Sequence, residues 1–386
     1  MGELIPGLPE EVARECLVRV GFDQLPVVRR ISRQWKSEVE SPYYHRLRRA
    51  EGLSRPVLAL AQARPAAPAD DDDAAAAGPA AHKHSSAGPA NSYRMVLLDP
   101  VEGRWAPLPA PPGPAESLPL FCQVAAVDGG GARPGRKRLV VVGGWDPETW
   151  APVDSVLVYD FLTGAWRRGA PMPGPRRSFF ACAAVGGNVY VAGGHDEEKN
   201  ALRSAMAYDP DADAWAHLPD MAEERDEPRG ICVGGRFLVV GGYPTQAQGR
   251  FVGSAEAFDP VTSTWAAVQD GLIEDGACPR TCCAAPGSPG RLYMLRDGNL
   301  VARDGGAGPN AAWRTVAQVP EDARTAATVA VIPDGRVVLI GAGCHGGEQT
   351  VYVLREEEGG KGASWERAAA PPEFSGHVQA SCFLEI

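Results

Sequence analysis

Six tryptophans recur in this chain at intervals of 61, 49, 50, 48 and 52 residues, and this repeat constrains the fold more than any other feature. Each tryptophan follows a short apolar segment and a turn. An alternating apolar strand, a turn that begins with Asp and a second strand predict a β-hairpin. The sequence therefore predicts six hairpins with Trp105, Trp166, Trp215, Trp265, Trp313 and Trp365, and the first four turns begin at Asp99, Asp160, Asp209 and Asp259.

Another pair of predicted strands precedes most of these hairpins. In three successive units this pair ends in a double glycine, and the double glycines are spaced by 50 and 48 residues. Glycine pairs at a strand end permit unusual backbone angles and a close approach of neighbouring strands. Four strands in a unit of about 50 residues are typical of a β-propeller blade. The strand pairs end at Gly143–Gly144, Gly193–Gly194 and Gly241–Gly242 and, in altered form, at Arg296–Gly298 and Gly341–Gly343.

The order Gly-Gly, Tyr-Asp and Trp, followed by Met-Pro-x-Pro-Arg at Met172–Arg176, resembles the kelch repeat. The resemblance covers about three quarters of the chain and implies an all-β kelch propeller. We expect six blades, because the two ends of the chain complete one of them and thereby remove exposed sheet edges. In this composite blade the first strand is His377–Ile386, the second Pro56–Gln62, the third Met95–Asp99 and the fourth Arg104–Leu108.

Glycine and proline make up about a fifth of the chain, with 45 and 35 of 386 residues. One segment is rich in these residues but does not show the spacing of about 50 residues. In residues 64–92, Ala, Pro and Gly surround the acidic run Asp70–Asp73. Such a segment cannot bury enough apolar surface to offset its ordering entropy. We therefore expect residues 64–92 to be a disordered insertion inside the composite blade.

Charge and hydropathy exclude several classes of partner. The formal net charge is −10 and no Lys/Arg stripe is present, which argues against nucleic acid. No apolar run approaches the ~18 residues of a membrane span, and the first residues do not form a secretory signal. We expect no membrane partner and a location in the cytoplasm, the nucleus or both.

The nine cysteines are odd in number and include no C-x-x-C pair, which favours neither a disulfide framework nor a zinc site. Several of them fall on the predicted first strand of successive blades, nearest the propeller axis, where a small apolar side chain suits the crowding. We expect a packing role for Cys122, Cys182, Cys232, Cys282 or Cys283, and Cys382.

Residues 3–52 predict a small all-α module with helices at Leu8–Gly21, Asp23–Glu40 and Tyr43–Ala50. The pattern Leu-Pro-x-Glu…Cys-Leu…Leu-x-x-Val-x-x-Ile-Ser-x-x-Trp closely resembles an F-box. This resemblance implies a three-helix module that docks on the Skp1 adaptor of cullin-RING ubiquitin ligases. The residues that match the family pattern, and that we expect to bind Skp1, are Leu8, Pro9, Val12, Leu17, Leu25, Val28, Ile31 and Trp35.

The whole chain is similar to the plant F-box/kelch-repeat proteins, with an F-box module at residues 3–52 and a six-bladed kelch propeller at residues 53–386, closed by the C-terminal strand. The resemblance implies a substrate receptor of an SCF (Skp1–cullin–F-box) ubiquitin ligase that binds a Skp1-like adaptor and, through it, a cullin. Some members of this family direct the turnover of phenylalanine ammonia-lyase, and others that of cytokinin response regulators. The resemblance supports the role and leaves the target open.

In a propeller, the loops after the second and fourth strands emerge on one face, around the central channel. Here these loops carry aromatic residues favoured at binding hot spots, and an arginine recurs just before the first strand. A ring of arginines would bind an acidic segment of a target; alternatively, each arginine pairs with an acid of a neighbouring loop and ties blades together. We expect a target to contact Trp145, Trp150, Arg177, His195, Arg229, Tyr243, Arg280, Arg324 and His345.

Two other classes of function remain as alternatives. Some kelch propellers hold copper, but that chemistry needs convergent His, Tyr and Cys ligands, and the seven histidines are scattered. We therefore expect neither a catalytic site nor a metal or other cofactor. The second alternative is a kelch-repeat scaffold that binds proteins without coupling to a ligase.

Overall fold

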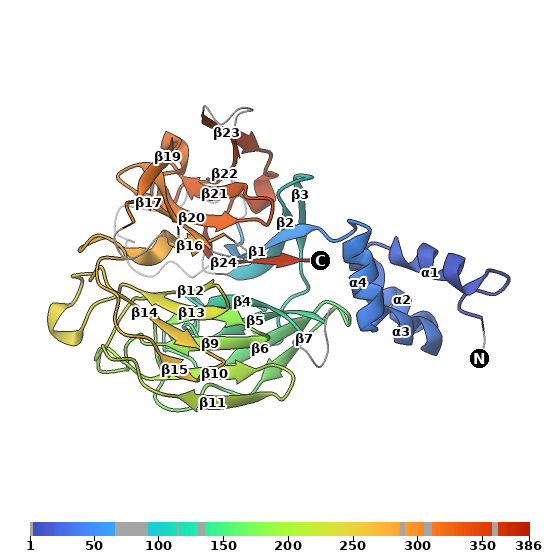
Figure 1. The fold of residues 1–386 in the computed structure, drawn as a ribbon, viewed down its shortest axis with the longest axis horizontal. Helices are drawn as coiled ribbons and strands as arrows, with labels where there is room; N and C mark the ends of the chain where they lie inside the picture. Colours follow the sequence, from blue (N-terminus) through green and yellow to red (C-terminus); the bar gives the residue numbers. More distant parts are fainter. Residues whose placement is uncertain are drawn as a thin grey trace, which may run out of the picture.

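In the computed structural model, the described residues are 3–65, 92–113, 116–129, 136–285, 290–304, 311–356 and 362–386. A group of short helices lies at one side of an assembly of six four-stranded antiparallel sheets (Figure 1). The predicted architecture, a small helical module followed by a six-bladed propeller, is confirmed. The expected disorder of residues 64–92 concerns residues that lie, for the most part, outside the described ranges.

The helical module differs from the prediction in its middle. Instead of one helix over Asp23–Glu40, the chain forms two, because the backbone is extended at Ser32, with φ −151° and ψ 161°. The Ser32 side chain accepts a hydrogen bond from the backbone N–H of Trp35 at 3.0 Å, and such capping stabilises a new helix start. The helices are α1 (Glu10–Val18), η1 (Phe22–Gln24), α2 (Leu25–Ile31), α3 (Arg33–Val39) and α4 (Pro42–Ala50).

No helix in the described ranges is long and apolar enough to cross a membrane.

Five of the six sheets are each built from one continuous stretch of chain, with the first strand at one edge and the fourth at the other. Their strands are β4 (Gln123–Asp128), β5 (Lys137–Val142), β6 (Val156–Asp160) and β7 (Ala165–Gly169); β8 (Ala181–Val185), β9 (Asn188–Ala192), β10 (Ala205–Asp209) and β11 (Ala214–Leu218); β12 (Arg229–Val233), β13 (Arg236–Val240), β14 (Ala255–Asp259) and β15 (Thr264–Trp265); β16 (Cys283–Ala284), β17 (Arg291–Arg296), β18 (Asn299–Asp304) and β19 (Arg314–Gln318); and β20 (Thr325–Val331), β21 (Val337–Ala342), β22 (Gln349–Glu356) and β23 (Ala363–Ala368).

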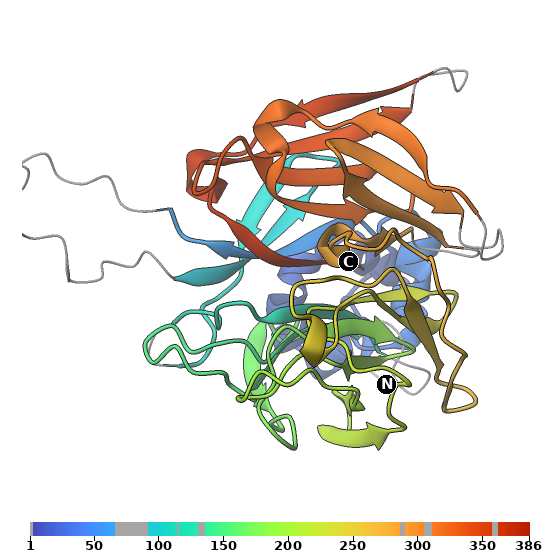
Figure 2. The same ribbon diagram turned by 90° about the vertical axis from the view of Figure 1, so that its left-hand side faces the viewer.

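The sixth sheet joins both ends of the chain, as the sequence predicts. Its order is β24-β1-β2-β3, with Ala59 of β1 opposite Cys382 of β24 and Leu98 of β2 opposite Trp105 of β3. Figure 2 shows the C-terminal strand beside the strand that follows the helices. The bounds are β1 (Pro56–Ala63), β2 (Tyr93–Asp99), β3 (Arg104–Pro107) and β24 (Val378–Glu385).

The repeated tryptophans connect neighbouring blades. In each of the six, the indole N–H donates a hydrogen bond to a backbone carbonyl in the segment that leaves the preceding blade, which explains why the residue recurs once per blade. The donor–acceptor distances run from 2.7 to 3.1 Å, and the pairs are Trp105 to Ala369, Trp166 to Pro109, Trp215 to Ala170, Trp265 to Pro219, Trp313 to Leu272 and Trp365 to Gln318.

The innermost strands pack closely, as the cysteine pattern indicates. A Cβ placed on Gly230 of β12 would lie 2.5 Å from the backbone nitrogen of Cys182 in β8, so larger side chains do not fit there. Cys122 and Cys282 are also buried, whereas Cys232 is exposed and departs from the expected packing role.

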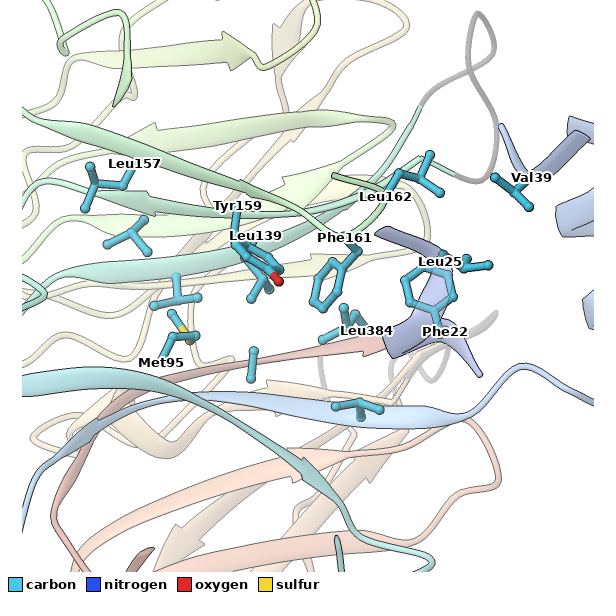
Figure 3. Packing of buried hydrophobic residues seen from close by; sticks show 14 of the residues in the cluster. Phe22, Leu25, Val39, Met95, Leu139, Leu157, Tyr159, Phe161, Leu162 and Leu384 are labelled. Carbon is cyan, nitrogen blue, oxygen red and sulfur yellow. The ribbon is translucent and has the colours of Figure 1, made fainter. Parts of the chain in front are cut away.

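The helices pack on the end of the propeller where the innermost strands finish. The ring of Phe22 meets that of Phe161, in the turn after β6, edge-on with centroids 5.8 Å apart. Leu384 of β24 belongs to the same buried cluster (Figure 3). Arg49 of α4 lies 3.5 Å from both Asp128, at the end of β4, and Glu385. The loops at the start of β4 therefore lie on the opposite face, about 20 Å away along a six-residue strand.

Candidate functional site at the channel mouth

A cavity of about 200 Å³ opens where the innermost strands begin, on the face opposite the helices. Every blade contributes to its lining, and a second cavity of about 520 Å³ continues along the same strands. The two cavities share Arg229 and Gln123 among their walls and together form the central channel. One lining residue from each blade is Phe121, Phe179, Glu227, Arg280, Ala326 and His377.

Four of these six residues have a left-handed backbone. The φ angles are 55° at Phe121, 52° at Phe179, 51° at Glu227 and 50° at Ala326. Bulky residues adopt this conformation at a cost of about 1–3 kcal/mol, and such strained positions gather at binding sites. A hydrogen bond from the Phe121 N–H to Oε1 of Gln379, at 2.7 Å, holds one of them in place. The repeat therefore turns the same position toward the channel mouth in four blades.

An aromatic cluster forms one side of the mouth. Phe121 is 45% exposed, and its ring centroid lies 5.4 Å from that of Phe179 and 6.1 Å from that of Trp145. The Trp145 indole donates a hydrogen bond to Oγ of Ser178 at 2.8 Å, which fixes its orientation. This side offers the rigid apolar contact area that is typical of interface hot spots.

Arginines give the mouth a positive charge. The Arg280 side chain is 73% exposed and lies 3.8 Å from Glu227. Arg229 is half-buried in the channel wall, where its Nε donates to the carbonyl oxygen of Cys282 at 3.2 Å. Burial and then the charge of Arg280 lower the pKa of His377, which favours its neutral form. Glu227 in turn accepts a hydrogen bond from the Tyr243 hydroxyl at 3.0 Å.

The predicted ring of four arginines at one register is wrong. Arg177 is 1% exposed, and its Nη1 donates to the carbonyl oxygens of Gly193 (3.2 Å) and Ser204 (3.1 Å). Arg225 makes the matching bonds in the next blade, to Gly241 (2.8 Å) and Ser254 (3.2 Å). Both arginines stand 16 residues before the first glycine of the double glycine in their own blade. This spacing could have distinguished them, in the sequence, from the arginines that line the channel.

Arg177 therefore ties the loop of its own blade together, whereas the alternative reading has each arginine pair with an acid of a neighbouring loop. Burial lowers its pKa to about 10, so it still carries its charge at neutral pH. Arg324 is exposed and donates from Nε to the carbonyl oxygen of Val319 at 3.2 Å, away from the lining of the mouth. Of the four, Arg229 and Arg280 line the cavity.

The other predicted target-binding residues separate by exposure. His195 and Tyr243 are each 5% exposed, so they support the surface from below. Trp150, 53% exposed, and His345, also exposed, lie on loops of the same face. We did not predict Phe121, Phe179 and Gln379 as site residues from the sequence. For the two phenylalanines a signal was present, because one stands directly before Cys122 and the other three residues before Cys182.

The predicted Skp1-binding residues also divide into two groups. Leu17, Leu25 and Val28 are buried in the module, and Trp35 is half-buried, with its indole N–H bonded to the carbonyl oxygen of Leu4 at 2.6 Å. The remaining four are exposed, and the sequence did not single out two further exposed residues, Val27 and Tyr43. The exposed fractions are 37% for Leu8, 46% for Val12, 59% for Val27, 60% for Ile31 and 51% for Tyr43, and Pro9 is exposed too.

We call Leu8, Val12, Val27, Ile31 and Tyr43 the helical apolar set. Val27 and Ile31 are four residues apart on α2 and share one face of that helix. Exposed apolar side chains grouped on a small module are typical of a protein-binding surface.

Within the described ranges, no group of three or more His, Cys, Asp or Glu side chains is arranged to hold a metal ion.

Comparisons with known proteins agree with both halves of the structure. The F-box domain family matches residues 5–47, and the Kelch motif family matches residues 135–173 and 176–222. The chain is 40% identical to the F-box/kelch-repeat protein At1g80440 of Arabidopsis thaliana and 38% identical to At1g15670 of the same plant, over the full length of each pair. It is 33% identical to the F-box/kelch-repeat protein SKIP20 of Arabidopsis thaliana, over 97% of this chain and 94% of that protein.

Proposed function

Because the chain belongs to the F-box/kelch-repeat proteins, we propose that it is the substrate-recognition subunit of an SCF ubiquitin ligase. The helical module, residues 3–52, binds a Skp1-like adaptor and through it a cullin, and the propeller, residues 53–386, binds the target. The observation that carries this proposal is the placement of the two surfaces: the helical apolar set belongs to the module that packs on one face, and the channel mouth opens on the other. The chain thereby acts as a bridge and performs no catalysis itself.

The adaptor surface is tested by placing a charge in the helical apolar set. Ile31→Asp puts a carboxylate where we expect an apolar contact, and burying it unpaired opposes binding strongly. In a pull-down, we expect the recombinant Ile31→Asp chain to capture a Skp1-like adaptor at least about tenfold less than the unchanged chain does. Val261→Asp, at a 93% exposed valine on the propeller, is the matched control and should bind as the unchanged chain does.

Equal capture by both variants would show that Ile31 lies outside the adaptor surface. Absence of adaptor capture by the unchanged chain would instead favour the scaffold alternative, in which the chain binds proteins without a ligase. Trp35→Ala is a weaker test, since Trp35 is half-buried and its loss also loosens the fold of the module.

The target surface combines the aromatic cluster with Arg229 and Arg280, and we propose that it binds an acidic segment of the target by charge-assisted hydrogen bonds. Arg280→Glu reverses the most exposed of these charges. We expect it to lower target capture while adaptor capture and the melting temperature stay unchanged. Arg314→Glu, at an exposed position of β19 outside the lining, is the matched control. A fall in melting temperature with no specific loss of capture would contradict this assignment.

Phenylalanine ammonia-lyase and cytokinin response regulators are the first targets to test, on the strength of the sequence resemblance. We propose that the protein acts on such targets in the cytoplasm or the nucleus. Proximity labelling with residues 3–52 removed would trap targets that bind and are not passed on.

A further inference from the structure

The larger cavity of the central channel, about 520 Å³, is lined largely by apolar side chains. Of the described residues in its wall, only Arg229 has a charged side chain. Apart from Gln123, Ser381 and four cysteines, the other lining residues are apolar or glycine and come from all six blades. Burial raises the pKa of each cysteine thiol in the wall, so the thiols of Cys182, Cys232, Cys283 and Cys382 stay protonated. The cavity therefore holds one positive charge in apolar surroundings.

The guanidinium of Arg229 is half-buried and, within the described ranges, has no acidic partner. Its Nε donates to the carbonyl oxygen of Cys282 at 3.2 Å, and neither Nη1 nor Nη2 has a partner in these ranges. The buried Arg225, by contrast, lies 3.1 Å from Glu256. Charged side chains that leave water are normally paired, because an unpaired charge in apolar surroundings is costly. Arg229 therefore offers its two terminal nitrogens to a ligand.

Two polar side chains accompany Arg229 at the junction of the two cavities. Gln123 of β4, Arg229 of β12 and Ser381 of β24 each line both the smaller cavity at the mouth and the larger cavity. In the part of the chain that the structure describes, the side chains of Gln123 and Ser381 have no hydrogen-bond partner. We call these three residues the channel waist. An amide and a hydroxyl group are thus available to a ligand that reaches Arg229.

The charge and the wall together define the chemistry of a suitable ligand. A guanidinium with both terminal nitrogens free matches a carboxylate, which accepts two parallel N–H bonds. A second negative charge would find no counter-charge in the wall of the larger cavity, which favours a monoanion over a phosphate ester. The apolar wall requires an apolar body, and about 520 Å³ lies within the range of roughly 300–1,000 Å³ that is typical of small-molecule sites.

We propose that the channel waist binds a small organic monocarboxylate whose apolar part extends into the larger cavity. The carboxylate pairs with Nη1 and Nη2 of Arg229, and the smaller cavity at the mouth is the route of entry. The site shares Arg229 with the proposed target surface and lies below it in the channel. It does not depend on the ligase function, because neither the adaptor nor the target contributes to it.

Cys232 provides a reporter inside the larger cavity. It is exposed, lines this cavity and follows Arg229 by three residues on β12, about 10 Å along the strand. The aliphatic chain of octanoate is comparable in length, so octanoate that is bound through Arg229 covers the Cys232 thiol. Cys16 and Cys344 are also exposed and do not line either cavity.

The first experiment uses the complete chain with octanoate as the probe, without adaptor or target. Isothermal titration calorimetry measures binding, and peptide mass spectrometry follows the labelling of each cysteine by iodoacetamide. At an octanoate concentration about ten times its Kd, we expect labelling of Cys232 to slow by about tenfold, while Cys16 and Cys344 react as before. The absence of saturable binding, or equal slowing at Cys344, would overturn the proposal.

The unchanged chain also tests the class of ligand. Octanamide has the same aliphatic chain without the charge, and inorganic phosphate has the charge without the chain. We expect each to bind at least about tenfold more weakly than octanoate, since each lacks one of the two interactions. Octanamide that binds as tightly as octanoate would show that the carboxylate is not recognised. Phosphate that binds as tightly would show that the charge alone is recognised, and either result would overturn the proposal.

Substitution of Arg229 tests the residue itself. We expect Arg229→Gln to weaken octanoate binding by at least about tenfold, because the charge-assisted hydrogen bonds are lost. Arg229→Lys keeps the charge without the planar fork and should bind with intermediate affinity. Arg314→Gln, at an exposed arginine outside both linings, is the matched control.

Melting temperatures show whether these variants fold, and the comparison of octanoate with octanamide needs no variant. Equal octanoate affinity in Arg229→Gln and in the unchanged chain would refute the role of Arg229. Absence of adaptor capture would refute the ligase function alone, since octanoate binding is measured without an adaptor.

Discussion

Ser32 shows what single residues decide and where a sequence pattern is insufficient. Leu25, Val28 and Ile31 follow helical spacing and continue toward Trp35, so the periodicity predicts one helix. A serine hydroxyl competes for backbone N–H groups, and here it caps α3 and turns the chain by one extended residue. The apolar periodicity indicates which positions face the core. Both short helices keep these positions on the core side, so the break between the helices does not change the pattern.

Removing this cap should destabilise the module measurably. Ser32→Ala deletes the acceptor of the Trp35 N–H, which costs about 1 kcal/mol in typical helix caps. Thermal unfolding followed by circular dichroism measures the loss. Ser37→Ala, at an exposed position inside α3, is the control and should change stability little; equal effects of both variants would show that the cap does not matter.

His45 makes the helical module sensitive to acid. Burial, together with the charges of Lys137 and Arg48, lowers its pKa from 6.5 to about 4. The folded state therefore binds fewer protons than the unfolded state between these values. Stability is retained above pH 6.5 and falls as the pH drops toward 4, by about 3 kcal/mol for a shift of this size.

Denaturant unfolding at several pH values tests this. His45→Gln should flatten the fall between pH 6.5 and 4, while His217→Gln, at an exposed histidine on β11, should leave it as it is. An unchanged slope in His45→Gln would show that other groups cause the acid sensitivity.

At the scale of the elements, the sequence predicted the strands of the blades, whereas it predicted the residues of the channel mouth only in part. Trp recurs because it serves every blade, and Gly-Gly recurs in three successive blades, so their spacing predicts the strands. Arg177 and Arg229 look alike in sequence, yet one bonds loop carbonyls and the other lines the channel. The two side chains point in different directions because Arg229 stands four residues later in its blade than Arg177 does in the preceding blade. The loops differ in length from blade to blade, so the sequence does not reveal this shift.

The inner strands should protect their buried cysteines from reagents, unlike Cys232 of β12, which is exposed. Burial raises the pKa of Cys122, Cys182 and Cys282 to about 12, so these thiols are protonated as well as covered. With iodoacetamide at about pH 8, we expect the folded chain to label at its exposed cysteines, which are Cys16, Cys232, Cys278 and Cys344. Peptide mass spectrometry reads the sites, and unfolded chain provides the control. Equal labelling of Cys182 and Cys344 in the folded chain would contradict the close packing of the inner strands.

At the scale of the whole molecule, the chain joins two opposite surfaces through one ring. The composite sheet of β24, β1, β2 and β3 follows directly after the helices, and Arg55 exchanges backbone hydrogen bonds of 2.6 and 2.9 Å with Ile386. The end of the chain is thereby fixed beside the helical module. This arrangement sets the distance between the helical apolar set and the channel mouth, the two surfaces at which we propose that the adaptor and the target bind.

Hydrogen–deuterium exchange of the complete chain, with and without a Skp1-like adaptor, tests the central claim most directly. The account predicts slower exchange in the segments around Leu8–Val12 and Val27–Ile31 when the adaptor is present, and unchanged exchange around Phe121 and Phe179 at the channel mouth. Slower exchange at the channel mouth, or no change in the helical segments, would contradict it.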